Sequence, residues 1–401
     1  MANKLNILQN STSNAPINSK NDVKTPSLTR QNMSFYRGSK PGPDLSASGK
    51  EKTYAKLKKE LADKSYKPNF CLIVVSRKCN YECEMCNYWK VEDSPELTYD
   101  EIIAVVDDLK RITDENIVVH IIGGETMLFP RFLEIVEYIT KTGFRASIST
   151  SGSLLSKSMC ERLVKSGITG VFVSIDSLDE KKHDELRGIK GAYKKVMNGL
   201  DNLYDFKKKH NSNLCIGTTI TIMEKNIDDV LEVIDWANSD KKINDVFINA
   251  VMQPFNNEDS NTEWFNEIRY KDIWPQDMEK VDKLIEQLKK RKKNGWKISN
   301  PAQQLHAMKQ YFATPFEYVS KLKMKCPRGD LAVEINPEGD IDMCFYDKPI
   351  GNIRKTSLYD IWYSKKMLQS RFKINTCEKN CDLVINCFYT PKNITNYVTH
   401  Y

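Results

Sequence analysis

Three cysteines in the first quarter of the chain have a spacing that suggests metal chemistry. Cys79, Cys83 and Cys86 form the pattern C-x3-C-x2-C directly after an apolar run at 71–76. Thiolates bind both zinc and iron–sulfur clusters. A closed zinc site needs four ligands, and no histidine or further cysteine follows at finger spacing. A cluster held by three cysteines keeps one iron open to a non-protein ligand, so the spacing favours a cluster and leaves zinc as the alternative.

Cysteine is unusually frequent elsewhere in the chain, which has eleven in 401 residues. The N-terminus lacks the basic-then-apolar pattern of a secretory signal, so we expect a cytoplasmic protein whose thiols bind metal and do not form disulfides. A second group lies in the last fifth of the sequence: Cys326, Cys344, Cys377, Cys381 and Cys387. The remaining three, Cys71, Cys160 and Cys215, lie inside predicted strands or a helix and are expected to be small core residues.

Alternating strands and helices must position the first cysteines. Short apolar, β-branched runs occur at 71–76, 117–122, 145–150, 170–175, 214–222 and 245–251. Amphipathic stretches separate them, starting near Tyr99, Arg131, Ser156, Tyr193 and Asn226. This βαβ rhythm predicts an α/β fold, either an open, partial (β/α)6 TIM-like barrel or a doubly wound sheet. In both arrangements the chemistry belongs on loops at the carboxyl ends of the strands.

The remaining segments divide the chain into five expected parts. Residues 1–50 are rich in Ser, Asn and Pro and are expected to be a flexible leader. An N-terminal helix at 51–68 precedes the barrel core at 69–255, and a helical connector follows at 256–320. The last part, 321–401, is expected to be a small cysteine-rich domain with a hairpin turning at 337–339 and a helix near 357–370.

Charge and hydropathy exclude two classes of partner. The formal net charge is +7, but residues 1–50 contribute +5 of it, so no basic face for nucleic acid is implied. No uninterrupted apolar run reaches the roughly 18 residues of a membrane span. The sequence therefore predicts a protein that binds neither nucleic acid nor membrane.

A second motif turns the cysteine pattern into a family resemblance. Gly123, Gly124 and Glu125 follow the second predicted strand, where paired glycines permit a ligand to approach the backbone closely. With C-x3-C-x2-C after the first strand, this resembles the radical S-adenosylmethionine (SAM) enzymes. The resemblance covers about residues 69–250. It implies a [4Fe-4S] cluster on Cys79, Cys83 and Cys86, with the fourth iron chelating SAM.

The same resemblance assigns the contacts of the cofactor. The segment Gly123–Glu125 would hold the amino group of SAM through its backbone. Ser174 and Arg187 would hold its carboxylate, which suits the guanidinium group. Thr150 lies where the family often has a threonine-asparagine-glycine turn, although Ser151 replaces the asparagine. Met85 stands where many members have an aromatic residue beside the adenine, and it would fill that role by soft packing.

The second cysteine group resembles the iron–sulfur extension called SPASM, or its shorter relative called twitch. Cys326-Pro327-Arg328 and the hairpin that ends before Cys344 fit this pattern. Five cysteines are too few for two fully cysteine-ligated clusters, so one auxiliary cluster is expected, with a zinc site as the alternative. In some family members an Asp after the hairpin cysteine accepts a substrate proton, and Asp347 is the candidate here.

These features predict a radical SAM oxidoreductase. Such an enzyme cleaves SAM reductively to a 5'-deoxyadenosyl radical, which abstracts hydrogen from a substrate. Oxidation or cross-linking of a peptide is the favoured activity, and a dehydrogenase or epimerase of a sugar or antibiotic intermediate is the alternative. The electron donor would be a flavodoxin or ferredoxin. A non-catalytic zinc-binding interaction protein is the contrasting class.

Overall fold

The structure is a computed structural model. It describes residues 46–91, 95–113, 117–254, 263–315, 326, 328–344, 346–378, 381 and 385–386. All of these residues belong to one compact unit that spans 41–401. The expected leader therefore lies almost entirely outside the described residues.

Six parallel strands form the core of the sheet, and each lies within two residues of its predicted position. They are β1 (Phe70–Val74), β2 (Val118–Ile122), β3 (Arg145–Thr150), β4 (Gly170–Ser174), β5 (Cys215–Ile222) and β6 (Asp245–Ala250). Their order is β6-β5-β4-β3-β2-β1, so each strand pairs with the next along the chain. Because β6 and β1 are not neighbours, the barrel is open. This confirms the expected α/β fold with a partial barrel.

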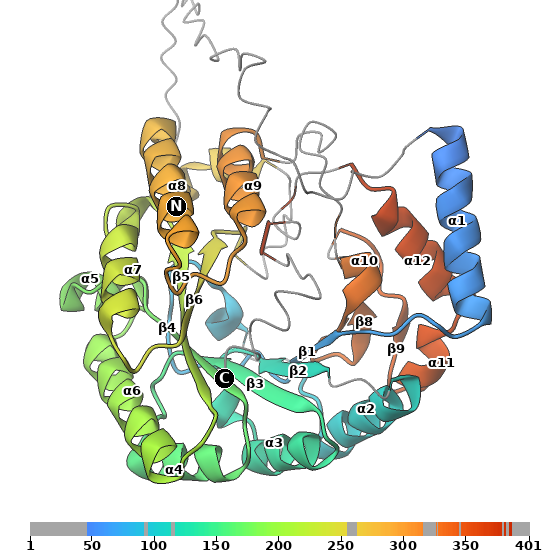
Figure 1. The fold of residues 1–401 in the computed structure, drawn as a ribbon, viewed down its shortest axis with the longest axis horizontal. Coiled ribbons are helices and arrows are strands. Elements are labelled where there is room, and N and C mark those ends of the chain that lie inside the picture. Colours follow the sequence, from blue (N-terminus) through green and yellow to red (C-terminus); the bar gives the residue numbers. More distant parts are fainter. Residues whose placement is uncertain are drawn as a thin grey trace, which may run out of the picture. The chain divides into compact units, whose positions relative to one another are not determined.

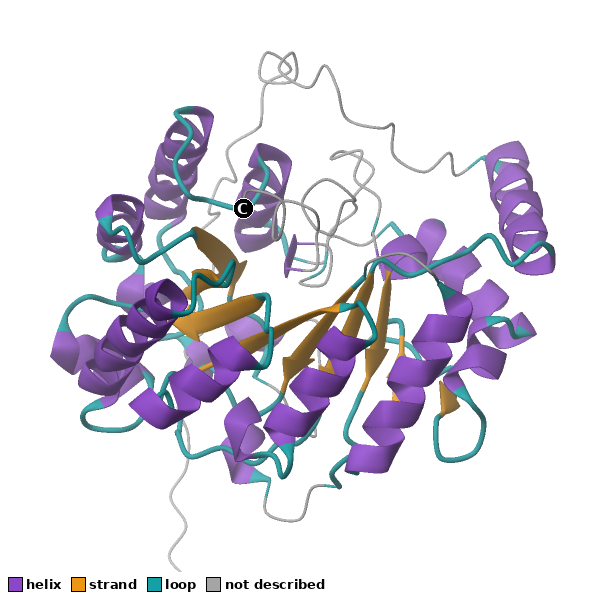
Figure 2. Ribbon diagram, turned by 60° about the horizontal axis from the view of Figure 1, so that its bottom comes forward, coloured by secondary structure: helices purple, strands orange, loops and turns teal. Residues whose placement is uncertain are grey.

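Helices cover one face of this sheet, as Figures 1 and 2 show. They are α2 (Tyr99–Ile112), α3 (Phe132–Lys141), α4 (Lys157–Lys165), α5 (Glu180–Leu186), α6 (Ala192–Lys209) and α7 (Val230–Ser239). Caps fix several starts: Thr98 and Glu101 form a capping box at α2, and Ser156 caps α4. The short helix α5 was not predicted. The lone cysteines Cys71, Cys160 and Cys215 are buried, as expected of core residues.

The connector contains α8 (Met278–Lys293) and α9 (Ala302–Ala313). The connector also has short 3-10 turns at Trp264–Asn266 and Ile268–Tyr270. Three further 3-10 turns lie in the loops of the barrel, at Tyr88–Lys90, Thr126–Leu128 and Glu224–Asn226. Trp264 and Trp274 pack edge to face at 5.3 Å between ring centroids, and Trp274 packs in the same way on Tyr311 of α9. These buried aromatic rings fix the connector against the barrel.

The C-terminal part continues the main sheet. It contains α10 (Arg328–Leu331), β7 (Ala332–Ile335), β8 (Asp340–Asp342), β9 (Gly351–Asn352), α11 (Leu358–Trp362) and α12 (Lys365–Asn375). β7 pairs in parallel with β1, and β8 returns antiparallel to β7. Gly339 has a φ of 81°, which provides the left-handed residue of the predicted hairpin turn. The sheet thus has nine strands, in the order β6-β5-β4-β3-β2-β1-β7-β8-β9.

The N-terminal helix α1 (Ala47–Ala62) starts four residues before the predicted boundary. The reason is Ser46, whose hydroxyl accepts a hydrogen bond from the backbone N–H of Gly49 and so caps the helix. Within the described part of the chain, no helix is long and apolar enough to cross a membrane. The predicted boundaries between the five parts remain predictions.

Candidate functional site

The first three cysteines lie together on the loop that leaves the carboxyl end of β1. Cys83 is buried with Tyr81 and Ala192, and Cys79 and Cys86 pack against the same small cluster. The backbone N–H of Cys86 donates to the carbonyl of Cys83 at 3.1 Å, which turns the chain between these two thiols. The predicted pattern therefore corresponds to one group of cysteines, of which Cys83 is buried and Cys79 and Cys86 are half-buried.

The paired glycines hold this cysteine loop from one side. The N–H of Gly124 donates to the carbonyl of Ser76, and that of Glu125 donates to the carbonyl of Lys78, both at 2.9 Å. A Cβ on Gly124 would lie 2.1 Å from the Lys78 carbonyl oxygen, and one on Gly123 would lie 2.5 Å from that of Ser76. The glycine pair therefore packs closely on the backbone of the cysteine loop, and the expected contact of its own backbone with a ligand stays a prediction.

Gly188 holds the same loop from the other side. Its φ of 66° is left-handed, and a Cβ there would lie 2.2 Å from the carbonyl oxygen of Glu82. The N–H of Glu84 donates to the carbonyl of Leu186 at 3.1 Å. Sequence reasoning missed Gly188, although a glycine directly after a helix is a recognised stop signal.

The side chain of Glu125 joins the ends of β2 and β3. It is 2% exposed, and its carboxylate accepts hydrogen bonds from the Thr150 hydroxyl at 2.8 Å and the Ser151 hydroxyl at 2.6 Å. The N–H of Ser151 donates to it at 3.0 Å. Ser151, where the family often has asparagine, thus anchors this turn. The side chains of Glu125 and Thr150 therefore stabilise the turn after β3 by hydrogen-bonding each other.

Arg187 faces the cysteines from the end of α5. Its guanidinium group forms a buried ion pair with Asp176 and donates from Nη1 to the Cys83 sulfur at 3.9 Å. Burial alone would lower the Arg187 pKa, but Asp176 and Cys83 raise it above its ordinary value. Its Nε is buried without a hydrogen-bond partner among the described residues, so one donor remains for a ligand. The Ser174 hydroxyl lies 3.3 Å from that of Thr219 on the next strand.

Burial also sets the protonation of the thiols. It raises the pKa of Cys79 to about 12 and that of Cys86 to about 11. Burial raises the pKa of Cys83 too, although Arg187 opposes the shift. Thiols that are this hard to ionise become thiolates when a cation replaces the proton. Three cysteines that pack together, one buried and two half-buried, therefore fit an iron–sulfur cluster with a polar ligand, since Arg187 beside them keeps a spare donor.

The second cysteine group is assembled from distant segments. Cys344 follows β8, and the neighbouring Cys377 thiol helps to raise its pKa, behind the larger effect of burial. Cys326 and Cys344 are half-buried against the main core, and Cys381 is buried in it. Cys387 lies outside the described residues.

Arg328 organises the hairpin from which Cys344 leaves. It is 2% exposed, pairs with Glu334 at 2.7 Å between Nη2 and Oε2, and donates from Nε to the carbonyl of Met343 at 3.0 Å. Asp347 pairs with Lys373 of α12 at 2.8 Å between Oδ2 and Nζ. That hydrogen bond lowers the pKa of Asp347, which makes it a weaker base.

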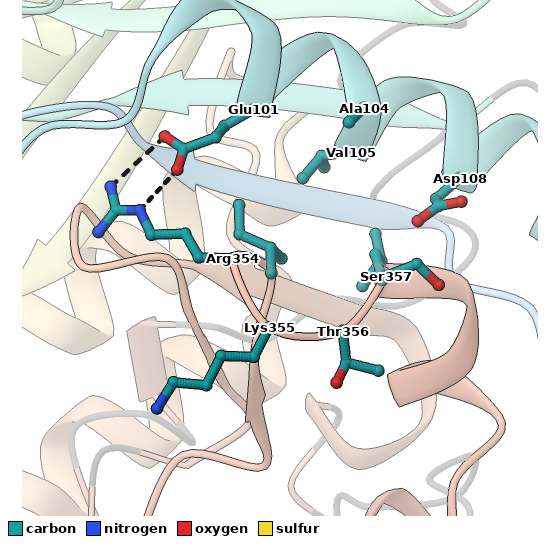
Figure 3. A pocket seen from close by; sticks show the side chains of 10 residues that line it. Glu101, Ala104, Val105, Asp108, Arg354, Lys355, Thr356 and Ser357 are labelled. Atoms are coloured by element: carbon teal, nitrogen blue, oxygen red, sulfur yellow. Dashed lines mark hydrogen bonds and ion pairs between the residues drawn. The ribbon is translucent and has the colours of Figure 1, made fainter.

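No three His, Cys, Asp or Glu side chains within the described ranges converge tightly enough to share one metal ion. A cluster of four irons is larger than one ion, so its ligands stand further apart. Away from the cysteines, Figure 3 shows a pocket of about 340 Å³ between α2 and the segment 353–358. Its Arg354 and Glu101 form an ion pair, 2.5 Å from Nε to Oε1, which ties the C-terminal part to α2.

An open parallel barrel with three clustered cysteines on the loop after its first strand, and more on an extension of the same sheet, defines a class of iron–sulfur barrel enzymes. The comparisons identify the family. The model of the radical SAM superfamily matches residues 73–237, and that of the SPASM iron–sulfur cluster-binding domain matches residues 326–387. The chain is a radical SAM enzyme with a C-terminal SPASM domain. Its cofactors are a [4Fe-4S] cluster, SAM and an auxiliary iron–sulfur cluster.

Two curated relatives illustrate the breadth of this family. The Fe-coproporphyrin III synthase of Methanosarcina barkeri is 31% identical over 42% of this chain and 40% of its own length. This chain thus spans about two fifths of that relative. The sporulation killing factor maturation protein SkfB of Bacillus subtilis is 25% identical over 78% of this chain and 69% of its own length.

Solved structures share the fold. Streptococcus suis SuiB bound to S-adenosylmethionine matches with a TM-score of 0.58 and 18% identity, over 81% of this chain and 73% of SuiB. The protein anSMEcpe with bound AdoMet and Kp18Cys peptide matches with a TM-score of 0.56 and 17% identity, over 77% and 84%. At these identities the likeness shows the fold alone.

Proposed function

We propose that this radical SAM enzyme is an oxidoreductase that oxidises or cross-links a peptide. The observation that carries the proposal is the match to SkfB, a maturation protein, over 78% of this chain. The match to Fe-coproporphyrin III synthase covers only 42%. SuiB, which shares the fold, has been solved with its precursor peptide SuiA.

The residues of the first site have separate tasks in this proposal. Cys79, Cys83 and Cys86 hold the cluster, and the backbone of Gly123–Glu125 and the side chains of Ser174 and Arg187 hold SAM. When bound, the cluster and SAM supply a 5'-deoxyadenosyl radical. Met85 is partly buried against the cysteine cluster, where it would pack on the adenine.

Neutral polar side chains near the carboxyl ends of the strands are compatible with a peptide substrate. Ser174 pairs in register with Thr219, and Thr221 pairs with Asn249. All four are only half-buried, unlike the alternate residues on the same strands. Hydroxyl and amide groups of this kind can hydrogen-bond the amides of a peptide without requiring a charge on it. They suit sugar hydroxyls equally, which keeps the small-molecule dehydrogenase or epimerase as the second candidate.

One electron would reach the first site from a flavodoxin or ferredoxin. After hydrogen abstraction, the auxiliary cluster would take one electron from the substrate radical. Asp347 is the proposed proton acceptor in this step. Its ion pair with Lys373 lowers its pKa, so it would serve as a base only after that pair opens. Substitution Asp347→Asn should therefore slow product formation and leave SAM cleavage unchanged.

The test begins with anaerobic reconstitution of the full chain with iron and sulfide. We expect about eight irons per chain, because two clusters of about four irons each would form. With dithionite and SAM, wild type should form 5'-deoxyadenosine, and Cys83→Ala should not. Cys160→Ala, which removes a core thiol outside both groups, is the control. Stoichiometric zinc without SAM cleavage would contradict the proposal.

The substrate class is tested on the same preparation. Precursor peptides encoded beside this gene would be incubated with enzyme, SAM and reductant, and examined by mass spectrometry. We expect a peptide to lose two hydrogens, as oxidation or cross-linking requires. Loss of two hydrogens from a sugar or antibiotic intermediate, with every peptide unchanged, would instead establish the small-molecule dehydrogenase.

A further inference from the structure

The edge strand β6 is covered by a regular series of partners from outside the sheet. Val246 forms two backbone hydrogen bonds there. Its N–H donates to the carbonyl of Lys297 at 2.8 Å, and its carbonyl accepts from the N–H of Ser299 at 2.9 Å. Two residues along, Ile248 has its N–H and carbonyl paired with the side-chain amide of Asn300, at 2.7 and 2.9 Å. An asparagine amide offers one acceptor and two donors, so it can replace a neighbouring strand.

The third member of this series comes from the cysteine-rich tail. The N–H of Ala250 donates to Oδ1 of Asn386 at 2.9 Å, and Nδ2 of Asn386 donates to the carbonyl of Ala250 at 2.8 Å. The N–H and carbonyl groups of residues 246, 248 and 250 all point away from β5, because successive residues of a strand direct these groups to opposite sides. Asn386 thus continues, at the carboxyl end of β6, the edge pairing that Asn300 begins.

The residue before Asn386 strengthens this attachment. Ile385 is fully buried, and its carbonyl accepts a hydrogen bond from Nε2 of the buried Gln304 on α9 at 2.6 Å. The hydroxyl of Tyr311 on α9 donates to the carbonyl of Val251, so α9 lies against the same end of β6. Figure 1 shows α9 beside β6. Within the described residues 385–386, the tail is therefore held by the burial of Ile385 and by the three hydrogen bonds named above.

Through this attachment the C-terminal part contacts both edge strands of the open barrel. β7 pairs with β1 at one edge, and Asn386 pairs with β6 at the other. Cys381 precedes Ile385 by four residues and is buried in the main core. The carboxyl end of β6 is on the side of the sheet where the cysteine loop leaves β1, because the strands are parallel.

We propose that Asn386 is a positioning residue that fixes the cysteine-bearing tail to the end of β6, and so keeps Cys381 where the auxiliary cluster needs it. The inference rests on an auxiliary cluster in the SPASM domain and goes beyond the proposed substrate. Without the Asn386 amide, Ala250 would lose both partners, and residues 385–386 would keep only the hydrogen bond from Gln304 among the three described above.

The test compares Asn386→Ala with Asn300→Ala in the reconstituted full chain. Each variant removes one amide from the same edge, so both should speed hydrogen exchange of the amide it covered, at Ala250 or Ile248, by about tenfold. Only Asn386→Ala should lose iron and the electron paramagnetic resonance signal of the auxiliary cluster. Formation of 5'-deoxyadenosine should persist in both variants, because the first cysteine loop is untouched.

Asn386→Asp sharpens the result. It keeps the acceptor for the Ala250 N–H but places a carboxylate against the Ala250 carbonyl, so it should release the tail as Asn386→Ala does. An unchanged auxiliary signal in both variants, with faster exchange at Ala250, would overturn the proposal and leave Asn386 as an edge cap. Wild type that forms no 5'-deoxyadenosine would instead contradict the enzyme assignment, independently of Asn386.

Discussion

The two cysteine groups of this enzyme are built in opposite ways. The first lies within eight residues of one loop, from Cys79 to Cys86, and two glycine-containing turns hold its backbone from both sides. The second extends from Cys326 to Cys387 and depends on a hairpin, a helix and a tail that reach it from separate parts of the sheet. The first group is a property of local backbone geometry, and the second is a property of the tertiary fold.

This difference predicts how each group fails. A local loop fails when a sulfur or a close backbone contact is lost, and the rest of the molecule remains folded. A site assembled from distant segments fails when any of its attachments is lost, even one without a cysteine. Predictions that compare paired variants can therefore test the distinction.

The largest effect should separate Cys83→Ala from Cys344→Ala. Cys83→Ala removes one of three ligands of the SAM-binding cluster, so 5'-deoxyadenosine formation should fall at least about a hundredfold. Cys344→Ala should lower the iron content by up to about four per chain and retain SAM cleavage without substrate. Iron analysis and product chromatography measure both quantities. Equal loss of SAM cleavage in the two variants would show that the clusters are not independent.

The next effect concerns the backbone that holds the first loop. Gly188→Ala would place a methyl group 2.2 Å from the Glu82 carbonyl and strain a φ of 66°. We expect a loss of about 3 kcal/mol in the free energy of unfolding, measured with urea on the apo-protein. Gly191→Ala is the matched control, because Gly191 also has a left-handed φ, of 83°, but nothing lies within 4 Å of its Cβ. It should cost about 1 kcal/mol.

Acid should weaken the region of the first loop at a higher pH than it affects Asp347 in the second. Burial, reinforced by Arg187, lowers the pKa of His183 to about 4 from an ordinary 6.5. Between these values the unfolded chain binds a proton that the folded chain does not, so stability falls as pH falls. We expect about 1 kcal/mol per pH unit in that window. Burial lowers the pKa of His120 to about 4 as well. His183→Asn should therefore reduce the dependence of stability on pH, and the part due to His120 should remain.

Asp347 provides the contrast in the C-terminal part. Its hydrogen bond to Lys373 lowers its pKa below the ordinary 3.8, so its contribution is complete above that value and is lost only at lower pH. Urea unfolding of the apo-protein at a series of pH values would compare wild type, His183→Asn and Asp347→Asn. A slope near pH 5.5 that His183→Asn leaves unchanged would contradict this account of the first region.

The smallest effect should be electronic. Arg187 donates to the Cys83 sulfur, and a positive hydrogen-bond donor at a cluster sulfur favours the reduced cluster. Arg187→Lys keeps the charge but loses the fork that also engages Asp176. In this variant we expect the midpoint potential of the SAM-binding cluster to become more negative by roughly tens of millivolts, as measured by spectroscopic titration. A raised KM for SAM with an unchanged potential would assign Arg187 to the cofactor alone.

Sequence patterns predicted the features that repeat at short range. The six core strands and the start of α2 at Tyr99 follow from apolar periodicity. The hairpin turn at Gly339 follows from its turn residues. The cysteine loop was visible because its chemistry lies in consecutive residues. Each of these signals is complete within a window of about ten residues.

Contacts between distant residues left no comparable signal. Glu125 was expected to contribute through its backbone, and its carboxylate in fact joins Thr150 and Ser151 from the next strand. Asn386 is the one polar residue in an apolar run at 383–389 near the C-terminus, and nothing in that run indicates that it pairs with Ala250. Such partners are determined by the fold, and a single sequence does not reveal which segments meet.

The pairing of β7 with β1 also affects the order of folding during synthesis. Phe70 faces Ala332 across this ladder, so the first strand of the barrel waits for about 260 further residues before its second edge is covered. Contacts of such long range form slowly, and an uncovered strand edge can pair with another chain. The ribosome therefore exposes β1 and the adjoining cysteine loop together until late in translation. Cluster insertion at that stage would meet an accessible loop, and a nascent chain delayed there would be prone to aggregate.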